Sequence, residues 1–433
     1  MRITKRCFAT ALLILFFCAC SKADINGSLL KAVENGDLKT VMKCLKNGAN
    51  VNTTDNEGAT ALILAARKGH MDIVSQLIIG GADINAADND GATALLWAIQ
   101  EYQGDVVSQL IDMGSDVNAK ANENVSPLIV AIQKGYADIV ARLIAKGADV
   151  HERDDENVTP LLWAADLANA DIVAQLLSRG VDVNASDNDG STALMKAVEK
   201  GRVDTVALLI ARGADVNAKD NDGVTALMRA AGEDNTEDIG NQGITSLMVV
   251  SAEDKIAIIS QLIARGADVN AKDNDGFTAL IRASENGCED CVKKLIAGGA
   301  NVNAVDNDGY TALIVASEEN NADVVALLLA NGANVNMQTT DGATALIKAS
   351  AQGNTDCIKL LLAKGANVNA KASDGGTALI MASGQGDADA VKILLSKGAK
   401  VNLKMSDGSD ALSTAIINNH NEIIEILKSA NAK

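Results

Sequence analysis

The chain repeats itself every 33 residues over most of its length, apart from one break after Gly223. A glycine marks each unit and is followed by the pattern x-Thr-Ala-Leu or a close variant of it. The positions of this register are Gly58, Gly91, Asn124, Asn157, Gly190, Gly223, Gly276, Gly309, Gly342, Gly375 and Gly408. Because a period of this length is typical of stacked repeat proteins, function must be sought on a surface that the repeats build together.

Local signals within a unit predict helix, loop, helix and hairpin. Thr60 and its counterparts stand where a side-chain oxygen would cap a first helix, and the only two prolines, Pro127 and Pro160, follow such caps at the first helical position. A second apolar stripe, such as Ile73–Ile78, ends at Gly81, as expected of a helix that closes on a left-handed residue. The following Asp-Asn-Asp-Gly segments are typical of a tight turn with a residue at positive φ.

These units resemble ankyrin repeats. The family pattern D-x-x-G-x-T-P-L-H-x-A-A-x-x-G-H-x-x-I-V is matched almost completely by residues 55–74, and the match recurs along the chain. The resemblance implies an all-α solenoid of stacked helix-loop-helix-β-hairpin repeats. Where the family carries the histidine of T-P-L-H, this chain has Ile63 and elsewhere Ile, Leu or Met. An apolar residue there fills the same space without leaving a donor unpaired.

The break in the period predicts the organisation of the array. Gly223 is followed by Gly243 after only 20 residues. Residues 225–231 predict a first helix, but residues 232–243 are acidic and lack an apolar stripe, so we expect this unit to have no second helix. We therefore predict an N-terminal ankyrin block at 24–231, an acidic insertion at 232–243 and a C-terminal ankyrin block at 244–433.

The first residues predict export. Arg2, Lys5 and Arg6 precede an apolar stretch, residues 8–19, that is too short to span a bilayer and is placed as in a secretory signal. We assign residues 1–19 to a signal peptide of the lipoprotein type, with Cys20 as the lipidated residue.

Two cleavage sites compete in this segment. Residues 17–20 resemble a loose bacterial lipobox, whereas cleavage after Ala23 would release a soluble protein. We favour the lipid on Cys20, because Ser21 and Lys22 begin a short polar tether before the first repeat. The predicted location is the periplasm or the outer membrane, with secretion as the alternative, and membrane contact only through the lipid.

The charge balance excludes one class of partner. The net charge is −18, or −21 without Arg2, Lys5 and Arg6, and no basic stripe offsets it. Since phosphate neutralisation dominates nucleic-acid binding, we expect no nucleic-acid partner. Acidic turns such as Asp220-Asn221-Asp222 resemble half a calcium loop, but Ala231 stands where its last glutamate would be, so ordinary turn chemistry is favoured. We expect a monomer without metal or cofactor.

The cysteines are the residues on which an enzymatic function could rest. Cys44, Cys291 and Cys357 fall on core positions of second helices and are interpreted as small hydrophobic residues. Cys288 and Cys291 nevertheless form a C-x-x-C motif at a helix start, where the helix dipole lowers a thiol pKa and export would allow oxidation. No nucleophile, base and orienting residue recur together, so we expect no catalysis.

Aromatic residues indicate where a partner would bind. Phe277 and Tyr310 follow the register glycine in adjacent repeats, a position that ankyrin repeats expose on their concave binding face, and the basic Arg282 lies nearby. Trp97 and Trp163 share a register that also holds Lys and Arg, so each is either a half-buried ring packed on a hairpin or a partner contact.

Together these features predict a non-catalytic protein–protein interaction scaffold in the bacterial envelope, which binds a protein on the concave face. Two alternatives stay open: a secreted ankyrin protein that acts on host proteins, and a thiol-active protein that uses Cys288 and Cys291.

Overall fold

The computed structural model describes residues 25–232 and 250–431 of the chain. The predicted signal segment with Cys20 and the predicted insertion after Gly232 lie outside the described residues. Within the described ranges the chain forms α-helices, one short 3-10 helix, η1 (Asn122–Asn124), and no β-strand. The predicted all-α repeat architecture is confirmed.

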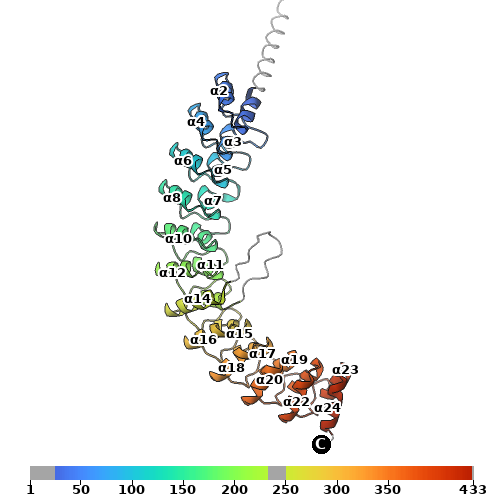
Figure 1. The fold of residues 1–433 in the computed structure, drawn as a ribbon. Coiled ribbons are helices and arrows are strands. Elements are labelled where there is room, and N and C mark those ends of the chain that lie inside the picture. The colour runs from blue at the N-terminus through green and yellow to red at the C-terminus, as the bar shows by residue number, and fades with distance from the viewer. Residues whose placement is uncertain (1–24, 233–249, 432–433) are drawn as a thin grey trace, which may run out of the picture. The chain divides into compact units, whose positions relative to one another are not determined.

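The chain divides by its internal contacts into two compact units, Met1–Asn188 and Asp189–Lys433. Inside each unit, the first helices of successive repeats stack in one row and the second helices in another, as α3, α5 and α7 stack beside α4, α6 and α8 (Figure 1). This division falls within the turn at 187–190, whereas the sequence places a block boundary at 232–243. The two-block organisation stays a prediction.

In the first unit, residues 25–34 are helical and precede the first complete repeat. Its first helices are α3 (Ala61–Arg67), α5 (Ala94–Gln100), α7 (Pro127–Gln133) and α9 (Pro160–Asp166). Its second helices are α2 (Leu38–Lys46), α4 (Met71–Ile79), α6 (Gly104–Asp112), α8 (Ala137–Ala145) and α10 (Ala170–Leu177).

The second unit has the same alternation. Its first helices are α11 (Ala193–Glu199), α13 (Ala226–Ala231), α15 (Ala279–Glu285), α17 (Ala312–Glu318), α19 (Ala345–Gln352), α21 (Ala378–Gln385) and α23 (Ala411–Ile417). Its second helices are α12 (Val203–Ala211), α14 (Ala252–Ala264), α16 (Glu289–Ala297), α18 (Ala322–Ala330), α20 (Thr355–Ala363), α22 (Ala388–Ser396) and α24 (Asn421–Asn431).

Helix starts follow the predicted caps. The Thr60 hydroxyl accepts the Ile63 N–H at 3.2 Å, and threonine caps α5, α11, α15, α17, α19 and α21 in the same way. Ser126 caps the helix that begins at Pro127, and Thr159 caps the next one. Because four amide groups at a helix start lack internal partners, these caps set where each first helix begins.

The core is a thin layer between the two helix rows. Every residue of Ala61–Ala66 in α3 is at most 1% exposed, because this helix is covered by neighbours on both sides. The small alanines let successive first helices approach closely, as α3 and α5 do. On α4, by contrast, Ile73, Val74 and Leu77 are buried while the opposite side faces water, as the apolar stripe predicts.

Several hairpins are turns closed by a single antiparallel bridge, such as Ala87 with Thr93. The register residue at the turn is left-handed, with φ of +79° at Gly91, +58° at Asn124 and +64° at Asn157. The predicted positive φ is thus confirmed, and asparagine replaces glycine there because it tolerates this conformation.

A ladder of asparagine side chains connects successive hairpins. The Asn303 carboxamide oxygen accepts the backbone N–H of Asn334 at 2.8 Å, and its NH₂ group donates to the Gly332 carbonyl at 3.3 Å. Equivalent bonds recur from hairpin to hairpin in both units, for example from Asn118 to Asp149 and Gly147. The hairpin edge therefore supplies a regular series of polar connections between repeats.

The expectation that the unit beginning at Gly223 lacks a second helix is wrong. Helix α14 packs against α13 and also against α12 and α16, so it completes that unit. The Asn274 side chain donates to the Asn221 carbonyl across 53 residues, whereas the equivalent bond from Asn307 to Asn274 spans 33. The extra residues therefore lie between the two helices of one repeat, and stacking continues past them.

Candidate functional site

On one surface of the repeats, the side chains differ in polarity and charge from repeat to repeat, while the residues next to them are constant. This surface is formed by the turn residues and by the fourth residue after each first-helix cap, which we call the groove position. The groove positions are Leu64, Trp97, Val130, Trp163, Lys196, Arg229, Arg282, Val315, Lys348, Met381 and Thr414, of which Leu64, Val130 and Val315 are buried and the others half-buried. The residue that follows each of them is alanine in every repeat. We call this surface the inner face.

A turn aspartate holds the side chain at several groove positions. Asp154 Oδ1 accepts the N–H groups of Glu156 and Val158 at 3.1 and 2.8 Å, which leaves Oδ2 free for the Trp163 indole N–H at 3.0 Å. Asp88 divides its two oxygens in the same way and accepts the Trp97 indole N–H at 2.7 Å. One carboxylate therefore both shapes the turn and orients a functional side chain.

In some repeats the turn carboxylate and the hydrogen-bond donor at the groove position are both absent. Ala121 stands at the turn before Val130, and Ala372 stands at the turn before Met381, so two repeats lose the carboxylate and the donor together. Other repeats do not follow this pairing: Asp55 and Asp306 precede the apolar Leu64 and Val315, and Thr339 precedes the donor Lys348.

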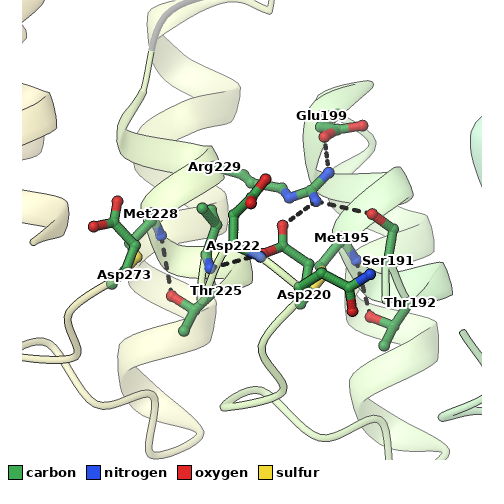
Figure 2. A network of polar contacts seen from close by, with 12 residues as sticks. Ser191, Thr192, Met195, Glu199, Asp220, Asp222, Thr225, Met228, Arg229 and Asp273 are labelled. Carbon is green, nitrogen blue, oxygen red and sulfur yellow. Dashed lines mark hydrogen bonds and ion pairs between the residues drawn. The ribbon is translucent and has the colours of Figure 1, made fainter. Parts of the chain in front are cut away.

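Arg229 forms the densest polar network on the inner face (Figure 2). Its guanidinium donates to Asp220 Oδ2 at 2.5 Å and to the Ser191 hydroxyl at 2.9 Å, and it also pairs with Glu199. The Arg229 and Asp220 side chains are only 15% and 7% exposed. Ser191 and Glu199 belong to the preceding repeat, so this one side chain bridges two repeats.

Phe277 and Arg282 form a pair within one repeat. The guanidinium lies 5.5 Å from the Phe277 ring centroid and donates to Asp273 Oδ2 at 2.6 Å. The ring is half-buried, not exposed as the sequence suggests, because the arginine lies over it. A cation over an aromatic face is attracted by the ring quadrupole.

Tyr310 receives its cation from the next repeat. Lys348 Nζ lies 4.8 Å from the Tyr310 ring centroid, donates to its hydroxyl, and pairs with Glu318 at 3.4 Å. Burial acts to lower the pKa of Lys348, but the Tyr310 hydrogen bond and the Glu318 charge outweigh it and raise that pKa. Tyr310 is half-buried as well. The roles of Phe277, Tyr310 and Arg282 in partner binding stay a prediction.

Both tryptophans are half-buried rings held by their own hairpins. The Arg67 guanidinium lies 5.2 Å from the Trp97 ring centroid and covers that ring from the preceding repeat. Trp163 differs from Trp97, because it lines a cavity of about 390 Å³ between two repeats. The alternative of a half-buried ring packed on a hairpin thus holds for both tryptophans, and partner contact stays a prediction for each.

The cavity beside Trp163 has a distinctive lining. Its residues are Asn124, Val125, Ile129, Gln133, Glu152, Arg153, Asp154, Asp155, Glu156 and Trp163. The Glu152 side chain is 6% exposed, bonds to the Ser126 hydroxyl and lies 3.3 Å from Lys120 Nζ. Burial raises the pKa of Glu152, although Ser126 and Lys120 act to lower it.

A second cavity of about 350 Å³ occupies the equivalent inter-repeat position in the other unit. Its lining includes Ala372, Ser373 and Met381, where the first cavity has Asp154, Asp155 and Trp163 in the same registers, and Lys348 lines it as well. A larger hollow of about 880 Å³ lies beside α22 and α24, but no aromatic side chain lines it.

Cysteine positions are partly as predicted. Cys44, Cys291 and Cys357 are buried in second helices, and burial raises the pKa of Cys357 to about 11. Cys288 caps α16 and is joined to Cys291 by a disulfide. Cys291 is therefore not simply a small hydrophobic residue. Sequence reasoning treated the motif as mainly structural, since spacing alone does not show that the two sulfur atoms meet.

Sequence reasoning missed two features. Tyr102 adopts φ of +54° in a register where Gly69 and Gly135 stand, is 55% exposed, and its ring centroid lies 4.3 Å from that of Tyr136. Glu152 was missed as well. In both cases the available signal is a residue that departs from its register, an aromatic at a glycine position and a glutamate at an alanine position.

Among the described residues, no three His, Cys, Asp or Glu side chains gather in a way that could hold a metal ion. In the same part of the chain, no helix is both long and apolar enough to cross a bilayer.

Comparison with known families defines the class of protein. The family model "Ankyrin repeats (3 copies)" matches residues 29–121, 106–187, 171–239, 247–339, 280–372, 328–405 and 346–433. The chain therefore belongs to the ankyrin-repeat family. Repeats of this kind generally serve as non-catalytic protein–protein interaction scaffolds. No curated protein matches the chain.

Proposed function

We propose that the protein is a non-catalytic scaffold that binds a partner protein along its inner face, the concave face of the family. One observation carries this proposal. The groove positions vary among aliphatic, aromatic and cationic residues, while the alanine beside each of them never changes. Folding needs the constant residues, so the varied ones are available to specify a partner.

Phe277 and Tyr310 are the proposed centre of the contact. Each ring is half-buried, and a cationic side chain, Arg282 or Lys348, lies over it. The ring would be the aromatic anchor of the contact, and the cation would be part of its polar rim. Binding hot spots combine such anchors with polar rims that exclude water. Acidic turns surround the pair, since Asp273 and Asp306 begin the neighbouring hairpins.

The test is affinity capture from envelope extracts with the purified protein. The double variant Phe277→Ala, Tyr310→Ala should lose the proteins that the wild type retains, and Lys293→Ala on the exposed side of α16 should keep them. Equal capture by all three proteins would reject the inner face as the binding surface.

The proposed location is the bacterial envelope, through a lipid on Cys20. It is supported by the basic residues and apolar stretch that precede Cys20. A mass spectrum of the mature N-terminus tests it: an acylated Cys20 means anchoring. A free Asp24 would indicate release and would favour the alternative, a secreted protein that acts on host proteins.

A thiol-active function is the second candidate, and the disulfide between Cys288 and Cys291 favours it. Cys288 is half-buried at the start of α16, where the helix dipole stabilises a thiolate. Thiol titration with and without reductant tests whether the pair cycles. A pair that stays reduced in the exported protein would exclude this candidate.

A further inference from the structure

Glu152 departs from the rule of its register. The equivalent positions in other repeats hold small or apolar residues: Thr53, Ala86, Ala119, Ala185, Ala218, Ala271, Ala304, Met337, Ala370 and Leu403. Ala185, one repeat further on, is 8% exposed and the other equivalents are half-buried, whereas the Glu152 side chain is 6% exposed. A buried carboxylate costs stability unless it is paired. Glu152 accepts the Ser126 hydroxyl and pairs with Lys120 at 3.3 Å, and it is the one charged residue of this register.

The cavity beside Glu152 combines negative charge with apolar walls. Four carboxylates line it, those of Glu152, Asp154, Asp155 and Glu156, against a single arginine. Arg153 is already engaged, since its guanidinium donates to the Asn157 and Ser186 carbonyls at 3.0 and 3.1 Å.

The other walls are aromatic and aliphatic. Trp163 lines one part of the cavity, and Val125 and Ile129 line another. A long cationic side chain has the matching chemistry, because its methylene stem suits aliphatic walls and its charged head suits carboxylates and an indole face.

The chain itself shows which cation fits this kind of groove. Arg229 occupies the same register as Trp163, and its guanidinium bonds to Asp220, the counterpart of Asp154. It also reaches Ser191 and Glu199 in the preceding repeat, in the registers of Val125 and Gln133. Where Trp163 stands in place of this arginine, its indole N–H bonds to Asp154 Oδ2 and a cavity lies beside the two residues.

We infer that the cavity between the repeats of Asn124 and Trp163 binds an arginine side chain of the partner protein. The inference rests on the proposed function and names the chemistry of the partner at one point of the inner face. Arginine is favoured over lysine because its planar guanidinium stacks on indole and presents five N–H donors to several carboxylates at once.

The experiment uses a small probe, so that it needs no partner. The chain has 2 tryptophans, and labelling with 5-fluorotryptophan gives one ¹⁹F resonance for each, assigned with Trp97→Phe. N-acetyl-arginine amide should shift the Trp163 resonance saturably, with a Kd on the order of 1 mM, which suits one side chain. The Trp97 resonance, whose ring is covered by Arg67, should not move.

Matched controls identify the cause of the shift. N-acetyl-citrulline amide has nearly the same shape without the charge and should bind at least about tenfold more weakly. Glu152→Ala restores the residue of the register and should weaken arginine binding about tenfold, as should the shape-conserving Glu152→Gln. Equal binding of both probes, unchanged binding by both variants, or no saturation up to about 20 mM would overturn the inference.

The outcome is separable from that of the proposed function. If the probe fails while the wild type still captures a partner through Phe277 and Tyr310, only the arginine pocket is rejected. If the probe binds but capture does not depend on the inner face, the pocket stands and the scaffold proposal is rejected.

Discussion

The groove between adjacent repeats is built alike in the two units but filled differently. In the second unit Arg229 fills it, and its guanidinium bridges Asp220, Ser191 and Glu199 (Figure 2). In the first unit Trp163 holds the turn aspartate instead and a cavity remains. The same backbone can thus use one position to tie repeats together or to leave an acidic pocket open.

A third form of the groove separates charge from shape. Around Met381 the cavity is nearly as large as the one beside Trp163, about 350 against about 390 Å³. Its turn residues are Ala372 and Ser373, and Lys348 lines it as well. Cavity volume alone therefore does not make a cation site. The two cavities differ in their balance of charge, since four acidic residues line the Trp163 groove against Arg153, whereas Asp341 and Asp374 line the other against Lys348.

The largest expected effect is on binding at the proposed contact. Phe277→Ala with Tyr310→Ala should weaken partner binding by about 2 kcal/mol or more, as for aromatic anchors. Stability should fall by only about 1 kcal/mol, because both rings are half-buried. Isothermal titration with the isolated partner and thermal melting measure the two quantities.

Its control lies in the adjacent core. Leu280 is 1% exposed, and Leu280→Ala should cost about 2 to 5 kcal/mol of stability without a specific loss of affinity. A ring variant that binds normally but melts much earlier would show that the rings belong to the core.

Removing the arginine side chain that fills the groove at position 229 should have a smaller effect, and this effect is on stability. Arg229→Ala leaves Asp220, whose side chain is 7% exposed, without its cation and should destabilise the second unit by about 2 kcal/mol. Arg282→Ala should cost less, since Arg282 is 31% exposed and has one carboxylate partner. Urea melting measures both. Equal losses would mean that the bridge to the preceding repeat adds nothing.

Glu152→Ala should instead stabilise the first unit, by about 1 kcal/mol at pH 7. The pKa of Glu152 is raised by burial, with Asp149 adding to the effect and Ser126 and Lys120 opposing it. The folded state therefore holds this proton at higher pH than the unfolded chain does. The wild type should lose stability relative to the variant as pH rises through the raised pKa.

Below the ordinary glutamate pKa of about 4.3 both states are protonated, and the pH-dependent difference should vanish. Urea melts of both proteins from pH 4 to 8, on the order of one per pH unit, measure this window. A variant that is less stable at neutral pH would mean that the Ser126 and Lys120 contacts make Glu152 a structural residue.

The smallest effect is expected at the cysteine pair. Cys288→His with Cys291→Ile should change stability by no more than about 1 kcal/mol, because the disulfide closes a very short loop and isoleucine fills the core position of Cys291. Partner capture should be unchanged. A folded variant that loses its function would promote the thiol-active alternative.

Structural features that depend on residues close in the sequence could be predicted from the sequence. Thr60 and the other caps, the left-handed Asn124 and Asn157 and the buried Cys357 each depend on one repeat, and the structure confirms them. Features set by the next repeat could not. The cation over Tyr310 comes from Lys348, 38 residues away, and depends on how the two repeats stack.

The prediction that the repeat of Gly223 lacks a second helix failed for a related reason. An insertion breaks the count of residues without breaking the stack, because α14 still packs on α12 and α13. The composition of residues 232–243 predicts only that these residues form no helix with an apolar stripe. It does not predict at which residue the next helix of the array begins. Glu152 could have been found from its register, since a charged residue among buried alanines is visible in the sequence alone.

The most direct test of the scaffold account is position-dependent photo-crosslinking within one repeat. A benzophenone amino acid at Met381, on the inner face, is compared with one at Lys392, on the exposed side of the second helix α22. The account predicts that a partner protein crosslinks from position 381 and not from position 392. Crosslinking to the same partner from position 392 alone, or equally from both, would contradict it.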